Sequence, residues 1–502
     1  MSDNLIDLFR SRAPDASKTL IETLDGGTIS YGEAYERAGQ FIAVLRSLGV
    51  RPDDRVMVKL DKSPDALILY LAVLAMGAVY VPLNVDYTLA ELDYFIGDAA
   101  PKVLICRPAE AGEASKLTGR HGVTSCLTLG TDGSGSLATM AKTAQSDIAV
   151  APRGADDLAA ILYTSGTTGR SKGAMLTHGN LASNALGLVK TWRFTDKDVL
   201  VHALPIFHSH GLFVGTNVTL TAGASMIFLP KFDADAIIGA LPRATAMMGV
   251  PTFYTRLLAD PRLTRDLVKH MRVFISGSAP LLAETHRAFE ARTGHKILER
   301  YGMTETNMNT SNPYDGDRVP GSVGLPLPGV EVRIVDPDSH RNLPVGEVGM
   351  VELKGPNVFK GYWRNPEKTA EAFRQDGWFI TGDLGRIDER GYLHLSGREK
   401  DLIISGGFNV YPTEVETEID ALPGVVESAV VGLPHPDFGE GVTAVVVAKE
   451  PLDEAATIAA LGQRLAKYKL PKRVLTVDEL PRNTMGKVQK NLLREQYKTL
   501  YG

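Results

Sequence analysis

Residues 159–173 have the sequence Ala-Ala-Ile-Leu-Tyr-Thr-Ser-Gly-Thr-Thr-Gly-Arg-Ser-Lys-Gly, an apolar run followed by a loop of small and basic residues. The run Ala159–Tyr163 predicts a buried strand. In the loop that follows, glycines let several backbone N–H groups converge, while hydroxyls and Lys172 add donors and charge. This combination suits a polyphosphate, although similar turns also occur as plain surface connections. It is not a Walker A loop, because the chain contains no Gly-Lys-Ser/Thr sequence.

The size and composition of the chain are those of a globular protein with several domains. Its 502 residues are 44% hydrophobic and 23% charged, which is enough apolar material for a large core. The net charge of −5 argues against a general nucleic-acid binder, although it leaves room for a local basic pocket. Only two cysteines occur, Cys106 and Cys126, so neither a disulfide framework nor a structural zinc site is supported. We expect a cytoplasmic protein without a signal peptide.

One uncharged segment, residues 66–85, is long enough on paper to span a membrane. Gly77 and Pro82 interrupt it, however. A buried helix over about 65–76 and a strand over about 78–82 explain the segment better. We therefore expect no membrane span.

Strand-like and helical segments alternate through the first part of the chain. The strand-like runs are 55–60, 78–83, 102–106, 199–204, 225–229, 246–250 and 273–276. This alternation predicts an α/β fold of stacked sheets covered by helices. After about Asn312 short strands replace helices, which predicts a β-rich subdomain over 312–397. Beyond it the pattern indicates a small α+β domain. We expect an N-terminal domain over 1–397 and a mobile C-terminal domain over 398–502.

Several other stretches carry residues suited to chemistry, and each also has a plain structural explanation. His208 and His210 follow a buried strand, but their i, i+2 spacing does not suit a helical zinc pair. Tyr301 is suited to stacking on a base, and Glu305 to holding Mg²⁺ with phosphate oxygens; both also fit an ordinary turn or helix. Asp383 is placed to accept hydrogen bonds from ribose hydroxyls, or to serve as a turn residue.

Taken in order, the motifs resemble those of the adenylate-forming superfamily of acyl-CoA synthetases, peptide-synthetase adenylation domains and luciferases. They are Tyr-Thr-Ser-Gly-Thr-Thr-Gly-x-x-Lys-Gly, Tyr-Gly-Met-Thr-Glu, Thr-Gly-Asp, Gly-Arg-x-x-Asp and Pro-Arg-Asn-Thr-x-Gly-Lys. They span essentially the whole chain, and the ordered set is far more specific than any one of them. Within the superfamily, residues 205–213 and 301–308 most resemble the malonyl-CoA synthetases.

The resemblance implies ATP, Mg²⁺ and CoA as ligands and gives a role to each matching position. The implied ATP and AMP contacts are Thr164, Ser165, Gly166, Thr167, Thr168, Gly169, Lys172, Gly277, Ser278, Ala279, Glu299, Arg300, Tyr301, Thr304, Asp383, Arg398 and Lys487. The implied catalytic set is Lys487, Glu305, Thr304 and His208, with Glu305 on Mg²⁺. Lys400 matches the hinge about which the last domain swings, and the implied CoA-facing loop is Ser405, Gly406, Gly407 and Phe408.

The residues around the expected acid pocket indicate which class of acid would be bound. A dicarboxylate needs a cation for its far end, because an unpaired buried carboxylate is costly. Arg256 is our candidate, since it lies in an uncharged stretch after a strand and a guanidinium matches a carboxylate at two points; a structural or surface ion pair is the alternative. His208 would help line the pocket. Ser209 and Met308 resemble positions beside the carbon between the two carboxyls.

The resulting hypothesis is an acid–CoA ligase that makes malonyl-CoA, and methylmalonyl-CoA from methylmalonate. Malonate, ATP and CoA would react through malonyl-AMP with release of AMP and pyrophosphate. Two alternatives remain open: a synthetase for a short-chain or aryl monocarboxylic acid, and an adenylation enzyme that loads a separate carrier protein. The resemblance also implies a lysine acetyltransferase and deacetylase acting on Lys487, because acetylation would remove its charge.

Overall fold

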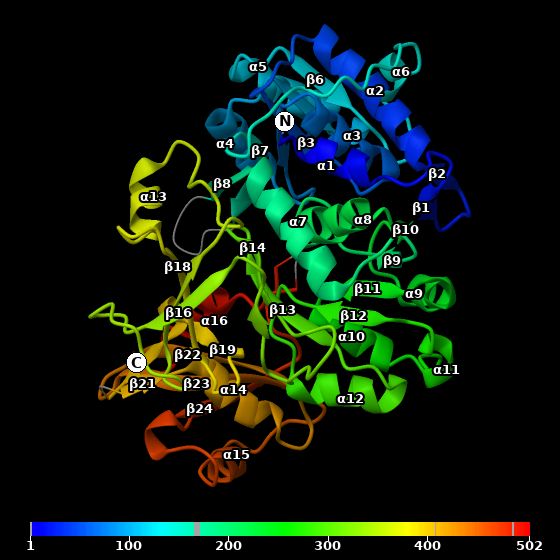
Figure 1. The fold of residues 1–502 in the computed structure, drawn as a ribbon. Helices are drawn as coiled ribbons and strands as arrows, with labels where there is room; N and C mark the ends of the chain where they lie inside the picture. Colours follow the sequence, from blue (N-terminus) through cyan, green and yellow to red (C-terminus); the bar gives the residue numbers. More distant parts are fainter. Residues whose placement is uncertain (1–2, 165–170, 407, 484–485) are drawn as a thin grey trace.

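The computed structural model describes residues 3–164, 171–406, 408–483 and 486–502, and Figure 1 shows how its elements are arranged. The predictions for Ser165–Gly169 and Gly407 lie outside these residues. Three layers follow one another from top to bottom in Figure 1: a first sheet with its helices, a second and larger sheet, and a C-terminal domain beneath them.

The first sheet has six strands in the order β6-β5-β3-β4-β7-β8. They are β3 (Arg55–Lys59), β4 (Val79–Pro82), β5 (Val103–Cys106), β6 (Ser125–Thr128), β7 (Leu158–Thr164) and β8 (Lys172–Thr177). All neighbours are parallel except β7 and β8, which form an antiparallel hairpin. Its helices are α2 (Tyr31–Ser47), α3 (Pro64–Ala75), α4 (Leu89–Ala99), η1 (Pro108–Glu110), α5 (Ala111–Arg120) and α6 (Ser136–Ala141).

The uncharged segment forms a core helix, as the sequence predicts. Ser63 caps α3 by accepting a hydrogen bond from the Ala66 backbone, and Pro64 supplies a preset first-turn residue. Every residue from Ala66 to Ala75 is buried, so the helix needs no polar face. Within the described ranges, no helix has the length and apolar character needed to cross a membrane.

The second sheet has nine strands in the order β15-β14-β13-β12-β11-β9-β10-β1-β2. They are β1 (Thr19–Thr23), β2 (Thr28–Ser30), β9 (Val199–His202), β10 (Ser225–Phe228), β11 (Ala246–Gly249), β12 (Val273–Ser276), β13 (Leu298–Met303), β14 (Asn307–Ser311) and β15 (Leu325–Pro326). The run from β13 to β1 is parallel, and antiparallel strands close both edges. The carboxyl ends of the parallel strands therefore meet at one edge, where ligands of α/β sheets usually bind.

The helices of this layer are α1 (Leu5–Arg12), α7 (His178–Trp192), the π-helix η2 (His210–Thr216), α8 (Asn217–Ala222), α9 (Ala234–Ala240), η3 (Leu241–Arg243), α10 (Pro251–Leu258), α11 (Arg265–Val268) and α12 (Ala283–Thr293). A π-helical turn is rare and often marks a functional site. Here it follows the strand that carries His202, so it begins at the ligand-binding edge of the sheet.

The β-rich subdomain is a four-stranded antiparallel sheet with the helix α13 (Pro366–Ala372). Its strands are β16 (Glu331–Val335), β17 (Gly349–Lys354), β18 (Phe379–Ile387) and β19 (Leu393–Arg398). The sequence predicts two short strands, 378–380 and 384–388, where the structure has the single strand β18. The Thr-Gly-Asp sequence breaks the apolar alternation, but Gly382 adopts a φ of +71° and the pairing continues beyond it with a bulge.

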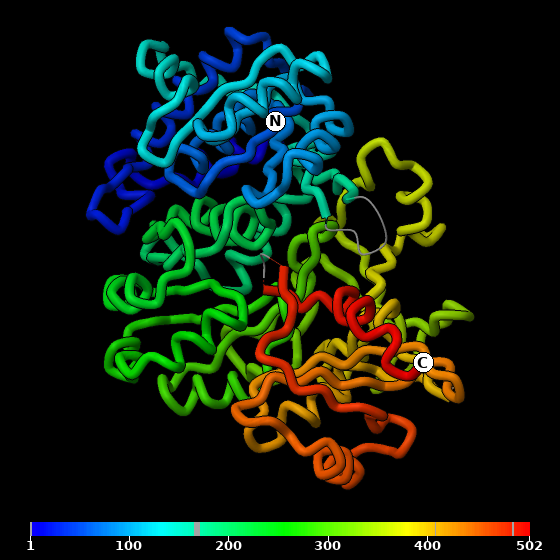
Figure 2. Tube along the Cα trace, turned by 180° about the vertical axis from the view of Figure 1, so that it is seen from behind, coloured from blue at the N-terminus to red at the C-terminus, as the bar shows by residue number. Residues whose placement is uncertain are grey.

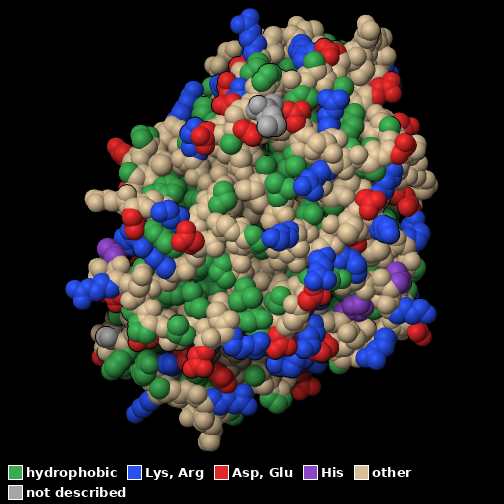
Figure 3. Space-filling view, in the orientation of Figure 1, with side chains coloured by type: hydrophobic (Ala, Val, Ile, Leu, Met, Phe, Trp, Pro, Cys, Tyr) green, Lys and Arg blue, Asp and Glu red, His purple; other side chains and the backbone are tan. Residues whose placement is uncertain are grey.

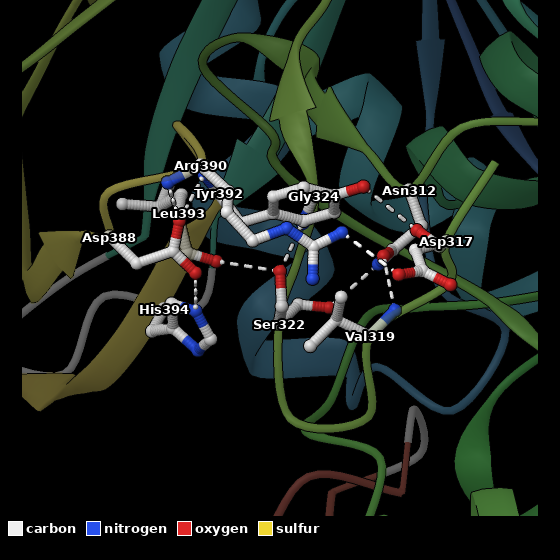
Figure 4. Close-up of polar contacts among 10 residues, drawn as sticks. All are labelled: Asn312, Asp317, Val319, Ser322, Gly324, Asp388, Arg390, Tyr392, Leu393 and His394. Carbon is white, nitrogen blue, oxygen red and sulfur yellow. Dashed lines mark hydrogen bonds and ion pairs between the residues drawn. The ribbon is translucent and has the colours of Figure 1, made fainter.

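A polar network ties this subdomain to the nine-stranded sheet (Figure 4). The Tyr392 hydroxyl donates to the carbonyl of Asp317 over 2.9 Å, and Arg390 pairs with the Asp317 carboxylate over 2.9 Å. Ser322 donates to the carbonyl of Leu393 over 3.3 Å. The β18–β19 hairpin is thus fastened to the loop that leaves β14, so Asp383 is fixed relative to Tyr301.

The C-terminal domain consists of one sheet with helices on its faces. Its elements are η4 (Glu399–Asp401), β20 (Ile403–Ser405), β21 (Phe408–Val410), α14 (Pro412–Asp420), β22 (Val425–His435), β23 (Gly439–Ala448), α15 (Glu454–Leu461), η5 (Lys467–Lys469), β24 (Arg473–Val477) and α16 (Lys490–Tyr497). The sequence predicts a helix over 455–468, but α15 ends before Gly462. The predicted domain boundary after 397 falls at the end of β19.

The C-terminal segment, red in Figure 2, rises from this domain to the centre of the molecule beside the N-terminal domain. On the face shown in Figure 3, Lys and Arg side chains are interspersed with Asp and Glu. That face therefore offers no broad single-sign surface of the kind that binds nucleic acid.

Candidate active site

The phosphate loop connects β7 and β8 at the end of the six-stranded sheet. Thr164 and Lys172 are paired across the hairpin, so they mark the two ends of the loop. Tyr94 of α4 donates to the Ser171 carbonyl over 2.7 Å. The Lys172 ammonium lies 4.2 Å from the centre of the Tyr362 ring. The loop is therefore held at its base, and its lysine points toward the neighbouring layer.

Thr304 and Glu305 lie in the turn between β13 and β14. The sequence of this stretch fits either a helix or a turn, and the structure has a turn. Glu305 is buried, with 8% of its surface exposed, and its Oε1 accepts a hydrogen bond from Tyr362 over 3.0 Å. Its backbone carbonyl accepts from the Phe359 N–H over 2.7 Å. These contacts fix one carboxylate beside the phosphate loop.

Asp383 forms the centre of the expected ribose site. Tyr301 donates its hydroxyl to one carboxylate oxygen, and Arg398 Nε lies 3.2 Å from the other. The Asp383 N–H donates to Thr381 over 2.9 Å. Burial and the Asp383 carboxylate raise the pKa of Tyr301, which keeps its hydroxyl a donor. Residues predicted separately from three motifs are therefore brought into contact.

The expected adenine site is built at the carboxyl ends of β12 and β13. Ser278 has a φ of +72°, a strained conformation for a non-glycine residue, and its hydroxyl lies 3.1 Å from Nδ1 of His210. A Cβ on Gly277 would lie 2.4 Å from the Arg300 guanidinium carbon, so the guanidinium lies directly against the Gly277 backbone. Glu299 accepts from the Leu281 N–H over 3.1 Å, and burial raises its pKa to about 8. Ala279 follows in the same half-buried loop.

Lys487 enters this site from the C-terminal domain. Its N–H donates to the Asn483 side chain over 2.9 Å, and Arg482 donates to the Gly486 carbonyl over 2.5 Å. A Cβ on Gly486 would lie 3.7 Å from Thr252 of α10, which places the loop against the N-terminal domain. Burial lowers the pKa of Lys487 to about 8, and its electrostatic neighbours are Arg398, Asp383, Glu305 and Arg300. The distant motifs therefore converge on one point.

The residues expected to hold the acid divide into two groups. His208 is half-buried and Ser209 is buried at the start of the π-helix, while Met308 is buried in β14 beside Gly302. Burial lowers the pKa of His208 to about 3, helped by the charges of Lys487 and Arg300, so its imidazole is neutral at pH 7. Arg256, in contrast, is exposed on α10, with its guanidinium 5.4 Å from the centre of the Phe232 ring.

Arg300 is the functional candidate that sequence reasoning placed differently. It is 3% exposed, and its Nε and Nη2 atoms have no hydrogen-bond partner among the described residues. Burial lowers its pKa to about 9. Its charge lowers the pKa of both His208 and His210, so the guanidinium acts electrostatically on the histidines at the start of the π-helix. The available signal was an arginine in an otherwise buried strand, where a charge needs a partner.

The expected hinge and the expected CoA-facing loop follow Arg398 in the chain. Lys400 is exposed in η4, and the following Asp401 accepts from Arg494 of α16 over 2.7 Å. Ser405 is buried, whereas Phe408 is 57% exposed and packs on Tyr468 of its own domain at 4.9 Å between ring centres. In this arrangement Phe408 is therefore on the surface, while Lys487 is in the candidate site.

The comparisons with known proteins agree with this geometry. Residues 9–363 match the AMP-binding enzyme family, and residues 414–487 match the AMP-binding enzyme C-terminal domain. The ATP-bound crystal structure of MatB from Rhodopseudomonas palustris is 62% identical over 100% of both chains, with a TM-score of 0.98. Its apo structure gives 0.87 at the same identity, so the present structure is closer to the ATP-bound form.

Two curated relatives are more distant. A malonate–CoA ligase of Arabidopsis thaliana is 34% identical, covering 98% of this chain and 89% of that protein. A feruloyl-CoA synthase of an Amycolatopsis species is 38% identical, covering 94% of this chain and 95% of that protein. The chain therefore belongs to the AMP-binding enzyme family, and its class is that of an ATP-dependent, AMP-forming acyl-CoA synthetase.

Proposed function

We propose that this enzyme joins malonate to CoA, making malonyl-CoA, AMP and pyrophosphate from malonate, ATP and CoA. Methylmalonate is its second substrate. The observation that carries the choice of a dicarboxylate is Arg300, a buried guanidinium whose charge acts on His208 and two of whose nitrogens have no hydrogen-bond partner among the described residues. A buried cation without a partner is costly, and a carboxylate that reaches it removes the cost. The likeness to MatB and to a malonate–CoA ligase agrees with this choice.

In this proposal Arg300 receives the far carboxylate and Lys487 the reacting one. The guanidinium offers two parallel donors to a carboxylate. Ser209 and Met308 flank the carbon between the two groups, so a methyl branch is tolerated and a longer one is excluded. Arg256 is the weaker candidate because its side chain is in water, where a bound carboxylate gains little.

The first half-reaction is attack of the substrate carboxylate on the α-phosphorus of ATP. Lys487 bridges the two negatively charged reactants, and Thr304 donates to the α-phosphate; Lys172 and the phosphate loop hold the β- and γ-phosphates, which leave as pyrophosphate. Asp383 and Arg398 hold the ribose. His208 stays neutral and lines the acid. Each of these groups positions or neutralises charge, and none becomes covalently bonded.

Mg²⁺ fits this site through Glu305. Within the described ranges no group of three or more His, Cys, Asp or Glu is arranged to hold a metal. Mg²⁺ needs no such cage, because it takes one or two carboxylates and completes its shell with phosphate oxygens and water. Glu305 supplies such a carboxylate beside the phosphate loop, and the bound ion would neutralise phosphate charge.

The second half-reaction is attack of the CoA thiol on the acyl adenylate. The acyl group is already activated, so Lys487 is no longer needed there. We propose that the C-terminal domain swings about Lys400, which withdraws Lys487 and brings Ser405–Phe408 to the thiol. The exposed position of Phe408 in the present arrangement agrees with a loop that is used only after such a swing.

The test is pyrophosphate release with malonate, methylmalonate, acetate, butyrate and ferulate. We expect malonate first and methylmalonate second. Arg300→Met should lower kcat/KM for malonate by about 10²-fold, the scale of a lost buried charge pair, and change that for acetate by less than about threefold. Arg256→Met is the matched control. If Arg300→Met keeps the preference for malonate over acetate, or Arg256→Met loses it, the assignment fails; a native preference for ferulate or butyrate would instead support the monocarboxylate alternative.

We also propose that acetylation of Lys487 switches the enzyme off, because it removes the charge that bridges the reactants. Lys487 is half-buried here, so a modifying enzyme reaches it when the domain has moved away. ATP with malonate should therefore slow acetylation in vitro. Mass spectrometry that finds the same rate with and without these substrates contradicts the proposal.

A further inference from the structure

The segment 359–363 lies between the phosphate loop and the expected metal-binding turn. On one side its backbone is bonded to β8: the Met175 N–H donates to Gly361 over 2.9 Å, and the Trp363 N–H donates to Gly173 over 2.7 Å. On the other side the Phe359 N–H donates to the Glu305 carbonyl over 2.7 Å. Because the backbone is hydrogen-bonded on both sides of residue 362, these bonds set the position of the side chain between them.

That side chain is Tyr362, which contacts two charged groups that belong to different motifs. Its ring face lies 4.2 Å from the Lys172 ammonium, and its hydroxyl lies 3.0 Å from Glu305 Oε1. It is 7% exposed and packs edge-on against Phe359 with 4.9 Å between ring centres. One ring thus serves a cation and a carboxylate at once.

The alternative arrangement of these charges would harm ATP binding. A lysine and a glutamate that both contact one buried ring attract each other, and a direct pair would occupy both groups. Among the residues that the structure describes, no ion pair joins Lys172 to Glu305; the phenol stands between them. A cation on a ring face keeps its full charge and leaves its N–H groups free, so phosphate can replace the ring at small cost.

We propose that Tyr362 is a positioning residue that keeps Lys172 and Glu305 apart, so that both are free when ATP and Mg²⁺ arrive. The ring holds the lysine at the base of the phosphate loop, and the hydroxyl orients the carboxylate toward the phosphates. This inference rests on the proposed ATP site but is independent of which acid is activated.

Two variants separate the two contacts. Tyr362→Phe keeps the ring and removes the hydroxyl; Tyr362→Leu removes both. We measure ATP affinity by calorimetry, once with Mg²⁺ and once with excess chelator. Tyr362→Phe should weaken only the Mg²⁺-dependent affinity, by about 3- to 10-fold for one hydrogen bond. Tyr362→Leu should weaken affinity in both conditions, by about tenfold or more. Tyr31→Phe, which removes a buried hydroxyl that donates to the Ala224 carbonyl and contacts none of the expected site residues, is the matched control and should leave both affinities unchanged.

A double-mutant comparison tests the separation itself. In the native background Lys172→Met should cost affinity; in the Tyr362→Leu background it should cost less, because Glu305 already occupies the lysine. Additive costs would overturn the proposal. So would unchanged affinity in Tyr362→Phe, a variant that keeps the packing and therefore does not depend on Tyr362→Leu folding well.

The second half-reaction tests whether Tyr362 has a purely structural role. Thioester formation from supplied acyl adenylate and CoA uses neither Lys172 nor Glu305, so both variants should keep it. Equal loss in both half-reactions would mean that Tyr362 merely supports the fold. A wrong choice of malonate leaves the calorimetry untouched, so failure of this inference and failure of the proposed acid are distinguishable.

Discussion

The ribose site and the Lys487 loop hold their charged groups in opposite ways. Asp383 is fixed by Tyr301, by Arg398 and by its own backbone contact with Thr381, and the strand that carries it is fastened to the large sheet. Among the described residues, Lys487 is hydrogen-bonded through its backbone N–H, which donates to the Asn483 side chain of the same loop. In the proposed mechanism, the groups that hold the nucleotide in both half-reactions are thus built into the fold. The cation that would be needed in only one half-reaction is carried on the C-terminal domain, which is proposed to swing away.

The two regions also differ in whether the charged group has an oppositely charged partner beside it. Asp383 has its cation beside it in the structure, whereas burial lowers the pKa of Lys487 to about 8. An ammonium inserted among Arg398 and Arg300 is stabilised once negatively charged substrates fill the space between them. Closure of the C-terminal domain is therefore favoured by bound ATP and acid, which couples the position of Lys487 to substrate occupancy.

Removal of the Lys487 ammonium should have the largest effect. Lys487→Ala should lower acyl-adenylate formation by about 10²- to 10³-fold, because a preorganised charge at the reacting centre is lost. Thioester formation from supplied acyl adenylate should stay near the native rate. Pyrophosphate release and thioester formation, measured separately, check this. Equal loss in both assays would remove the contrast between the two regions.

Asp383→Asn should affect both half-reactions. The variant keeps the size of the side chain but replaces charge-assisted hydrogen bonds to the ribose with neutral ones, which corresponds to about 10- to 10²-fold weaker binding. The affinities for ATP and for the acyl adenylate should fall together, as measured by calorimetry or by KM in each assay. A loss confined to adenylation would show that Asp383 is not a shared nucleotide contact.

Lys172→Ala should be milder than Lys487→Ala. Lys172 contacts the leaving phosphates in company with the loop backbone, so its loss removes one charged contact among several, about tenfold in kcat/KM for ATP. Steady-state pyrophosphate release gives this value. Losses of comparable size in Lys172→Ala and Lys487→Ala would overturn the ranking and make the loop lysine part of the reacting centre.

The pH dependence should differ between the half-reactions. Lys487 must be protonated to bridge two anions, and its pKa of about 8 is that of the free enzyme in this arrangement. kcat/KM for ATP in adenylation should be at its maximum well below pH 8, where Lys487 is protonated. It should fall to about half of that maximum near pH 8 and decline further as pH rises. Thioester formation should lack this decline. Lys487→Arg, which stays charged, is the control; an identical alkaline decline in it would assign the titration to another group.

The motifs allowed much of the nucleotide site to be predicted from the sequence. Asp383, Arg398 and Tyr301 were each chosen from separate stretches, and the structure brings them into direct contact. The resemblance implies that Arg300 is a nucleotide contact, and that prediction stays open. Adjacent residues of a strand point to opposite faces, and the packed sheet adds that the Arg300 charge acts on His208.

Tyr362 illustrates the same limit. In the sequence it is one aromatic residue among many, far from both Lys172 and Glu305. Its role follows from two backbone pairings that no local pattern records, one with β8 and one with the turn after β13. A residue that acts between two motifs belongs to neither, so motif reasoning does not find it.

By itself the sequence determined the family, the α/β layers and the strand that leads into the predicted phosphate loop, because apolar periodicity and the order of the motifs are local or linear properties. Tertiary structure decided which cation faces the acid, what separates Lys172 from Glu305 and where Lys487 stands. These depend on burial and on contacts between segments that are distant in the chain. Charge balance in a buried site is a property of the whole neighbourhood, and the neighbourhood exists only in the folded protein.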